Sequence, residues 1–451
     1  MLIKSISEKR KESYISSTSL IIIALASAFF PRVLMLIKFP SMVNFLHFAV
    51  VPFVFGIAIS KSRSQDRQQL AASKQILFTL LLLLTIGLAS AFLNDVGLIN
   101  VILQFLLFNE PWMLLLAIIC IPMSTRSLNQ CRNYVLGFGF INLIFALLQK
   151  FILRWDRGLD PCGGLDGVDT ITGVFVCQGA GCIVGASVSM ALSAHYFVAA
   201  KHRPLWLREL IIFACLVQII VADAKQVLIV GGIALALLSL ANMKDVRKGI
   251  ISVVLVVTVA QIFWWAIFNF QFLSNFAGWI RPEIYSPDGE ATRFKLFGVN
   301  AILDNMHSLL HWLFGLGPGH TVDRLGGWML RDYSSLLAPL GATTNTIAAQ
   351  VWSQMSASWL ANGSTMFSPF FGWAAVWGDL GIVGIVTYCY LYFLIWRYLC
   401  KDDVSKFQLL CVFVVGWVQA GLQEPGFMLF VASLIGLHWQ EVRKQLDEKI
   451  I

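Results

Sequence analysis

Two short segments late in the chain contain residue types that commonly bind phosphate. An acidic, glycine-containing turn at residues 288–290 is followed by Arg293, and residues 315–320 read Gly-Leu-Gly-Pro-Gly-His. Arginine forms paired hydrogen bonds with phosphate oxygens, and glycine lets the backbone approach a ligand closely. We therefore predict an anion site made by Arg293 and the glycine turn, including Gly317 and Gly319. The alternative is that the glycines only end a helix and that Arg293 faces water.

Three further cations lie in or beside apolar runs. Arg32 is inside the first run, Arg157 is in the segment 154–173, which is rich in Gly and Asp, and Lys225 lies two residues after Asp223. Ionisable residues at membrane depth are candidates for function. The alternatives are an ion pair between Asp223 and Lys225, and an Arg32 side chain that reaches out to the lipid headgroups.

The sequence predicts neither a metal site nor a cofactor. The spacing of the aspartates in residues 154–173 does not fit a calcium-binding loop. His307 and His311 lie four residues apart but have no third ligand nearby, and the nine cysteines include no C-x-x-C pair. Cys162 and Cys177 fall in one predicted outer segment, where an oxidising compartment permits a disulfide. The sequence alone leaves that pairing open.

The composition requires a lipid environment around these residues. The 451-residue chain is 58% hydrophobic and only 13% charged, whereas a soluble domain has about 25% charged residues. Its apolar runs are long and continuous, which selects membrane-spanning helices over a barrel. The net charge of +8 agrees with Lys and Arg in cytoplasmic loops. Because no basic, aromatic-interleaved module is present, we expect no nucleic-acid partner.

About twelve apolar runs are long enough to be predicted as spans. A basic N-terminus precedes the first, which we interpret as an uncleaved anchor. The predicted fold class is an all-α polytopic membrane protein with a helical extracytoplasmic cap. The spans are predicted near residues 18–38, 42–60, 75–94, 98–121, 133–153, 173–199, 208–222, 226–241, 249–269, 369–396, 407–422 and 425–440.

Connections rich in Lys and Arg alternate with connections that contain few cations. Cytoplasmic loops carry the excess of Lys and Arg, so both termini are predicted to be cytoplasmic. The chain divides into N-terminal spans (1–269, about nine), a large outer loop (270–368), and C-terminal spans with a cytoplasmic tail (369–451). Helical periodicity at 291–314 and 345–361 predicts amphipathic helices in the loop, which we interpret as a cap over the membrane domain.

Several of these motifs together resemble the O-antigen polymerase and O-antigen ligase superfamily. They are Arg293 before an amphipathic helix, the Gly turn 315–320, the Gly-Asp-Leu-Gly-Ile-Val-Gly motif at 378–384, the Ala-Asp-Ala-Lys-Gln turn at 222–226, and Gly-Val-Phe at 173–175. The resemblance covers about residues 170–390. It implies a metal-independent glycosyltransferase of the membrane-embedded GT-C type, acting on undecaprenyl-pyrophosphate-linked glycans at the outer face of the bacterial inner membrane.

The resemblance also implies roles for individual residues. Arg293 would contact the pyrophosphate and His320 would act as base or orient the acceptor, with Asp323 or Glu290 as alternative bases. Stabilising the charge of the leaving group is the main electrostatic task of such a site, and the acceptor hydroxyl needs a base within reach. Further substrate-binding candidates are Arg281, Lys225, Arg157, Arg32, Gly317, Gly319 and Arg324.

Polymerase is the activity that we predict, with two alternatives. Ligases of the family carry a His-Asn or similar pair before the acidic Gly-Leu-Gly span, whereas residues 364–369 here read Ser-Thr-Met-Phe-Ser-Pro. This departure disfavours a ligase that transfers glycan to lipid A core. A small-anion transporter, such as one for bicarbonate, should show broken or charged helices in matching halves, a symmetry that the sequence lacks. Expected partners are the lipid-linked oligosaccharide, the bilayer, and a chain-length regulator or flippase.

Overall fold

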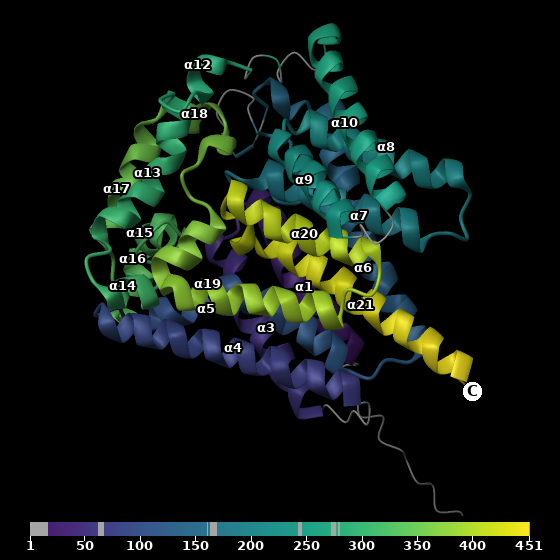
Figure 1. Ribbon diagram of the computed structural model, residues 1–451, viewed down its shortest axis with the longest axis horizontal. Helices are drawn as coiled ribbons and strands as arrows, with labels where there is room; N and C mark the ends of the chain where they lie inside the picture. Colours follow the sequence, from purple (N-terminus) through teal and green to yellow (C-terminus); the bar gives the residue numbers. More distant parts are fainter. Residues whose placement is uncertain are drawn as a thin grey trace, which may run out of the picture.

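A computed structural model describes residues 17–61, 67–159, 161–162, 169–241, 246–271, 277 and 280–450. Every regular element in these ranges is a helix (Figure 1). The basic N-terminal segment used for the orientation, part of the segment 154–173 and Lys244 lie outside the described residues. The prediction of an all-α protein is therefore confirmed for the part of the chain that the structure describes.

Six described helices are long and apolar enough to cross a bilayer. A bent pair, Thr18–Phe29 with Pro31–Ile37, would be a seventh span with a 51° break, and Lys225–Ala241 is a shorter apolar helix. The protein is thus a helical membrane protein, while the count of twelve spans stays a prediction. The six are Ser41–Lys61, Arg67–Leu93, Leu98–Cys120, Thr125–Arg157, Gly181–Ala199 and Gly372–Tyr398.

The individual helices largely follow the predicted apolar runs. Their bounds are α1 Ser17–Phe29, α2 Pro31–Leu34, α3 His47–Lys61, α4 Arg67–Leu93, α5 Leu98–Cys120, α6 Thr125–Phe151, α7 Gly181–Ala199, α8 Leu205–Val221, α9 Lys225–Ala241, α10 Val246–Asn269, α19 Gly372–Tyr398, α20 Asp403–Val418 and α21 Pro425–Ile450.

Three of the predicted runs are interrupted, and one of the breaks is at Gly381 within α19. The first run breaks at Phe30, directly before Pro31, because proline has no backbone N–H to continue the helical hydrogen bonds and its ring clashes with the preceding turn. The run predicted from residue 173 becomes helical only at Gly181. Gly173 and Cys177 both have positive φ, 63° and 55°, a conformation that an α-helix cannot contain. The interruptions at Phe30 and before Gly181 both lie beside the cavity described below.

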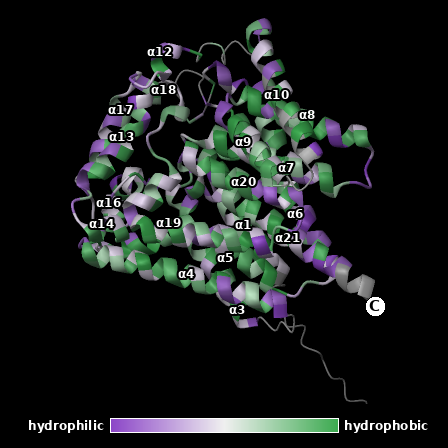
Figure 2. Ribbon diagram, viewed as in Figure 1, coloured by the Kyte–Doolittle hydropathy of each residue, from purple (hydrophilic) through white to green (hydrophobic). Residues whose placement is uncertain are grey.

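Helix α5 lies at the centre of the membrane domain and packs against α21, α3 and α4. Polar side chains join it to α19: Trp112 donates to the Tyr388 hydroxyl (3.1 Å), which donates to the Phe108 carbonyl (2.7 Å). Outward-facing side chains are apolar instead, such as Phe92, which is 86% exposed on α4, and hydrophobic residues run along α4 (Figure 2). Helices in lipid are expected to expose apolar side chains outward and to contact one another through polar side chains inside the bundle.

Short helices between α10 and α19 form a separate group at one side of the molecule (Figure 1). The periodic stretch 291–314 forms two helices, not one, since the chain leaves helical conformation at Met306 before Ser308 caps the second. The predicted position of this group over the outer face stays a prediction. Its members are α12 Pro282–Tyr285, α13 Glu290–Asn305, α14 Leu309–Phe314, η5 Leu325–Met329, α15 Leu330–Asp332, α16 Ser334–Leu337, α17 Thr346–Ala357 and α18 Trp359–Gly363.

Candidate functional site

The glycine turn 315–320 is attached to the beginning of α19. The Leu316 amide donates to the Gly378 carbonyl (2.8 Å), and a Cβ on Gly315, where φ is 80°, would lie 2.3 Å from the Asp379 carbonyl carbon. A helical break at Gly381, with φ of 66°, brings the two backbones together. Glycine is therefore required here so that two protein segments can approach each other.

The Asp379 carboxylate holds this turn in place. It accepts hydrogen bonds from the amides of Gly319 (3.1 Å) and Thr321 (3.0 Å), from the Thr321 hydroxyl (2.5 Å) and from the Gln104 amide (2.6 Å). The Gly319 amide thus already has an internal acceptor. The predicted role of Gly317 and Gly319 in substrate binding stays a prediction, while the structure gives both a part in anchoring the loop.

His320 is buried against neighbouring loop residues. It is 4% exposed, its Nε2 lies 3.1 Å from the Thr343 hydroxyl, and its Nδ1 lies 3.4 Å from the Asn345 amide. Burial lowers the pKa of His320, so the imidazole is neutral at pH 7. Because both ring nitrogens face loop side chains, a direct role as base requires this loop to open.

A cavity of about 440 Å³ lies between the membrane helices and the short-helix group. This volume falls within the ~300–1,000 Å³ of small-molecule sites. Arg32 of α2, the turn before α7, Arg324 beside η5, Trp352 of α17 and Glu424 before α21 all contribute to its wall. The cavity therefore unites segments that are almost 400 residues apart in the chain.

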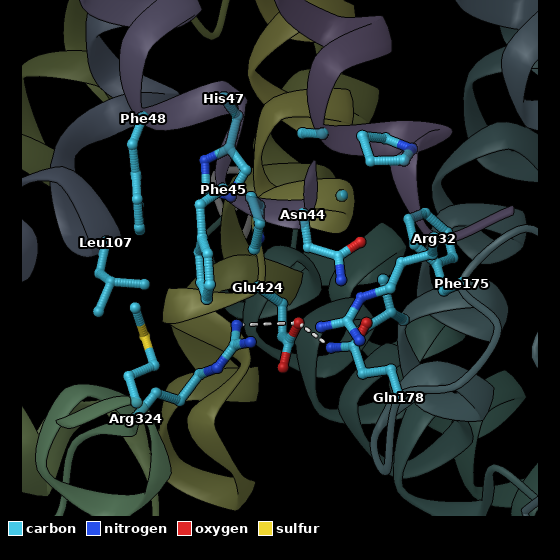
Figure 3. Close-up of a pocket in the computed structure, with 16 residues that line it drawn as sticks. Arg32, Asn44, Phe45, His47, Phe48, Leu107, Phe175, Gln178, Arg324 and Glu424 are labelled. Atoms are coloured by element: carbon cyan, nitrogen blue, oxygen red, sulfur yellow. Dashed lines mark hydrogen bonds and ion pairs between the residues drawn. The ribbon is translucent and has the colours of Figure 1, made fainter. Parts of the chain in front are cut away.

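Two arginines and one glutamate of this cavity's wall meet where the cavity borders a second, smaller chamber, whose lining Figure 3 shows. Arg324 Nη1 lies 3.1 Å from Glu424 Oε2, and the Gln178 amide donates to the same oxygen at 2.7 Å. Arg32 approaches from the other side and donates to the Cys177 carbonyl (3.1 Å). Arg32, Arg324 and Glu424 all line this smaller chamber, which has a volume of about 30 Å³.

Each arginine is held by backbone groups near it in space. Arg324 donates through Nη1 to the Gln423 carbonyl (2.5 Å), and its own amide donates to Gln423 Oε1 (2.8 Å). The carbonyl that receives Arg32 belongs to Cys177, which forms a disulfide with Cys162. The disulfide that the sequence left open is thus present, and it constrains the residue that positions Arg32.

Aromatic side chains form another part of the cavity wall. Trp328, Tyr333, Trp352 and Phe370 line it, and the Tyr333 hydroxyl is held by Ser41 at 3.0 Å. Aromatic rings provide rigid, amphipathic surface with little conformational freedom to lose. The cavity therefore combines a cationic end with an apolar, aromatic wall that includes scattered polar groups.

Asp323 lies beside the cationic end and is fully buried. Its Oδ1 accepts the Gly326 amide at 2.7 Å, and its carboxyl lies next to that of Asp379. Burial raises the pKa of Asp323 to about 6. This carboxyl belongs to the anchoring network of the glycine turn as well as to the cavity wall.

The other predicted cations lie elsewhere in the described structure. Arg293 is exposed on α13, Arg281 is exposed before α12, and Arg157 is exposed at the end of a short 3-10 helix. Lys225 pairs with Asp223 at 2.6 Å at the beginning of α9, the ion pair that was its alternative interpretation. These four described residues line neither of the two cavities, and their roles stay predictions.

Sequence reasoning missed Glu424 and Gln178 and gave Arg324 no special weight. The signal that could have identified Glu424 is an acidic residue in a short turn between two apolar runs. Among the described residues, no group of three or more His, Cys, Asp or Glu is arranged to hold a metal ion. Comparison of the chain with models of known protein families gave no match, and comparison with curated proteins gave none.

Proposed function

We propose that the protein polymerises oligosaccharide repeat units carried on undecaprenyl pyrophosphate at the outer face of the bacterial inner membrane. The reaction transfers the glycan of one lipid-linked unit to a hydroxyl of another and releases undecaprenyl pyrophosphate. The proposal includes twelve spans, cytoplasmic termini and an extracytoplasmic short-helix group. With that topology, the cavity opens on the side where such lipid-linked units are assembled.

The convergence of Arg32 and Arg324 carries this proposal. In the small chamber, these two permanent cations face one carboxylate, that of Glu424. Two arginines that face one chamber suit an anionic ligand, because arginine geometry matches phosphate oxygens. A diphosphate bound here would have its glycan against the aromatic wall formed by Trp328 and Trp352.

The same arrangement supports the chemistry of glycosyl transfer. As the bond between the anomeric carbon and the phosphate oxygen breaks, negative charge develops on the diphosphate. Fixed cations aimed at that charge lower the barrier, because a partly enclosed site weakens electrostatic interactions less than water does. Arg32 and Arg324 replace Arg293 as the residues that we expect to contact the diphosphate.

Polymerisation remains favoured over the alternatives. The residues that precede α19 contain no histidine of the kind that ligases of the resembled family carry. A small-anion transporter should show broken or charged helices in matching halves of the chain, and the sequence lacks that symmetry.

A reconstituted reaction tests the proposal. Purified protein in detergent is given lipid-linked repeat units extracted from cells that lack this chain, and the products are sized on a gel. We expect longer glycans together with free undecaprenyl pyrophosphate. Arg32→Ala and Arg324→Ala should strongly reduce the ladder of longer glycans, and Arg293→Ala serves as the matched exposed control. A wild-type protein that leaves glycan length unchanged and does not bind undecaprenyl pyrophosphate refutes the function.

A further inference from the structure

We propose that Glu424 is the general base that accepts the proton of the acceptor hydroxyl. This inference rests on the proposed function and assigns a catalytic residue to it. Glu424 lies in the turn between η8, Ala420–Gln423, and α21. It borders both the 440 Å³ cavity and the small chamber, so it lies where the glycan part and the diphosphate part of a donor would meet.

The two oxygens of the Glu424 carboxylate have different surroundings. Arg324 and Gln178 both contact Oε2, at 3.1 and 2.7 Å. These two contacts fix the orientation of the group, and the other oxygen points away from both partners (Figure 3). A carboxylate that is oriented through one oxygen and open at the other has the arrangement a positioned proton acceptor needs.

Three other candidate bases lie near the cavity. Asp332 pairs with Arg331 and borders only the 440 Å³ cavity, not the chamber where Arg32 and Arg324 meet. The other two, His320 and Asp323, are engaged within the protein. The ring nitrogens of His320 face Thr343 and Asn345. Asp323 is fully buried, accepts the Gly326 amide and lies against the Asp379 carboxyl. Asp323 belongs to the network that anchors the glycine turn, and the His320 ring binds the loop at residues 343–345, whereas Glu424 keeps 8% of its surface exposed.

The proposed step is balanced in atoms and charge. The acceptor O–H gives its proton to Glu424, and the freed oxygen lone pair forms the new bond to the anomeric carbon of the donor. The bond between that carbon and the phosphate oxygen breaks, and its electron pair leaves with undecaprenyl pyrophosphate. No oxidant, reductant or metal is required for this displacement.

Arg324 would couple the two halves of this step. Before transfer, Glu424 carries a negative charge beside Arg324. During transfer, Glu424 becomes neutral while the leaving diphosphate gains the charge that Glu424 lost. The total charge around Arg32 and Arg324 stays constant, so the site does not have to separate charge in a poorly solvated cavity.

The test compares Glu424→Gln with Glu424→Asp and with the control Glu283→Gln. Glu283 is exposed on α12 and lines neither the 440 Å³ cavity nor the small chamber. Turnover of the lipid-linked repeat units is measured together with binding of undecaprenyl pyrophosphate, followed by tryptophan fluorescence. Removing a general base lowers kcat by roughly 10²–10⁴-fold, and this is the loss we expect for Glu424→Gln.

Two readouts separate a base from a binding or structural residue. Glu424→Gln should bind undecaprenyl pyrophosphate as well as or better than the wild type, because a competing anion is gone. Glu424→Asp, which keeps a carboxylate, should retain part of the turnover that Glu424→Gln loses. Turnover of Glu424→Gln equal to that of Glu283→Gln would overturn the proposal, as would equal losses of binding and turnover. An inactive wild type that does not bind the lipid refutes the proposed function itself.

Discussion

Arg324→Ala removes one of the two cations that face the chamber. A unit charge about 5 Å from the developing charge, at an effective dielectric of about 20, contributes about 3 kcal/mol, on the order of 100-fold in rate. We therefore expect kcat/KM for the lipid-linked donor to fall by about 100-fold. Arg324→Lys should fall less, because it keeps the charge but loses the two-pronged contact.

The structure requires a folding control for this variant. The Arg324 and Glu424 side chains are only 11% and 10% exposed, and removing one member of a buried pair destabilises a protein by about 3–5 kcal/mol. Size-exclusion chromatography and thermal unfolding in detergent distinguish that effect from lost catalysis. Arg32→Ala gives an independent test of the same charge without unpairing Glu424.

Arg293→Ala decides between the sequence-based and structure-based assignments. Arg293 is an exposed arginine on α13, so we expect its loss to change kcat/KM by less than about threefold. If Arg293→Ala abolishes polymerisation while folded Arg324→Ala stays near wild type, the diphosphate binds at the short-helix group and our reasoning about the cavity is refuted.

Three further predictions concern the surroundings of the site. Cys162→Ser removes the disulfide that constrains Cys177, whose carbonyl accepts a hydrogen bond from Arg32. Binding of undecaprenyl pyrophosphate should therefore weaken in this variant. A reductant should weaken the binding in the wild type but not in the variant. Gly315→Ala places a Cβ against the Asp379 backbone at positive φ and should destabilise the protein by at least about 1 kcal/mol, measured by thermal unfolding; an unchanged transition would contradict the tight backbone contact. Burial lowers the pKa of Lys295 to about 7, which is below its value in the unfolded chain. The unfolded chain therefore binds more protons than the folded protein between about pH 7 and 10, and the free energy of unfolding should rise with pH over that window. Lys295→Met should lose this pH dependence, and an identical dependence in the variant would show that Lys295 is not its source.

Periodicity and composition predicted most of the helices because both are local properties of the chain. The run at residues 98–121 became α5, Leu98–Cys120, almost without change. The errors occur where tertiary contacts override hydropathy. The segment 173–180 is apolar enough to continue α7, yet Gln149 holds its backbone in a turn through hydrogen bonds with the amides of Thr172 and Gly173.

The site was predicted less completely than the helices. Arg32 and Arg324 were among the predicted residues and line the cavity, whereas Arg293 and His320 had stronger motif support and lie outside its wall. A motif records that residues are near one another in the sequence. The turn needs its glycines because it packs closely against the α19 backbone. A ligand that approaches the backbone closely requires glycine in the same way, so the sequence motif does not distinguish the two.

The sequence by itself determined that the chain is surrounded by lipid and that it forms helices. A chain that is 58% hydrophobic in continuous runs has to satisfy its backbone in helices within lipid. Only the tertiary structure decided which charges meet. Arg32, Arg324 and Glu424 are separated by up to 392 positions, as their residue numbers show (424 − 32 = 392), and no local pattern relates them. The breaks at Phe30, before Gly181 and before Pro425 bring them to one cavity, because helix packing sets the distances between residues far apart in the chain.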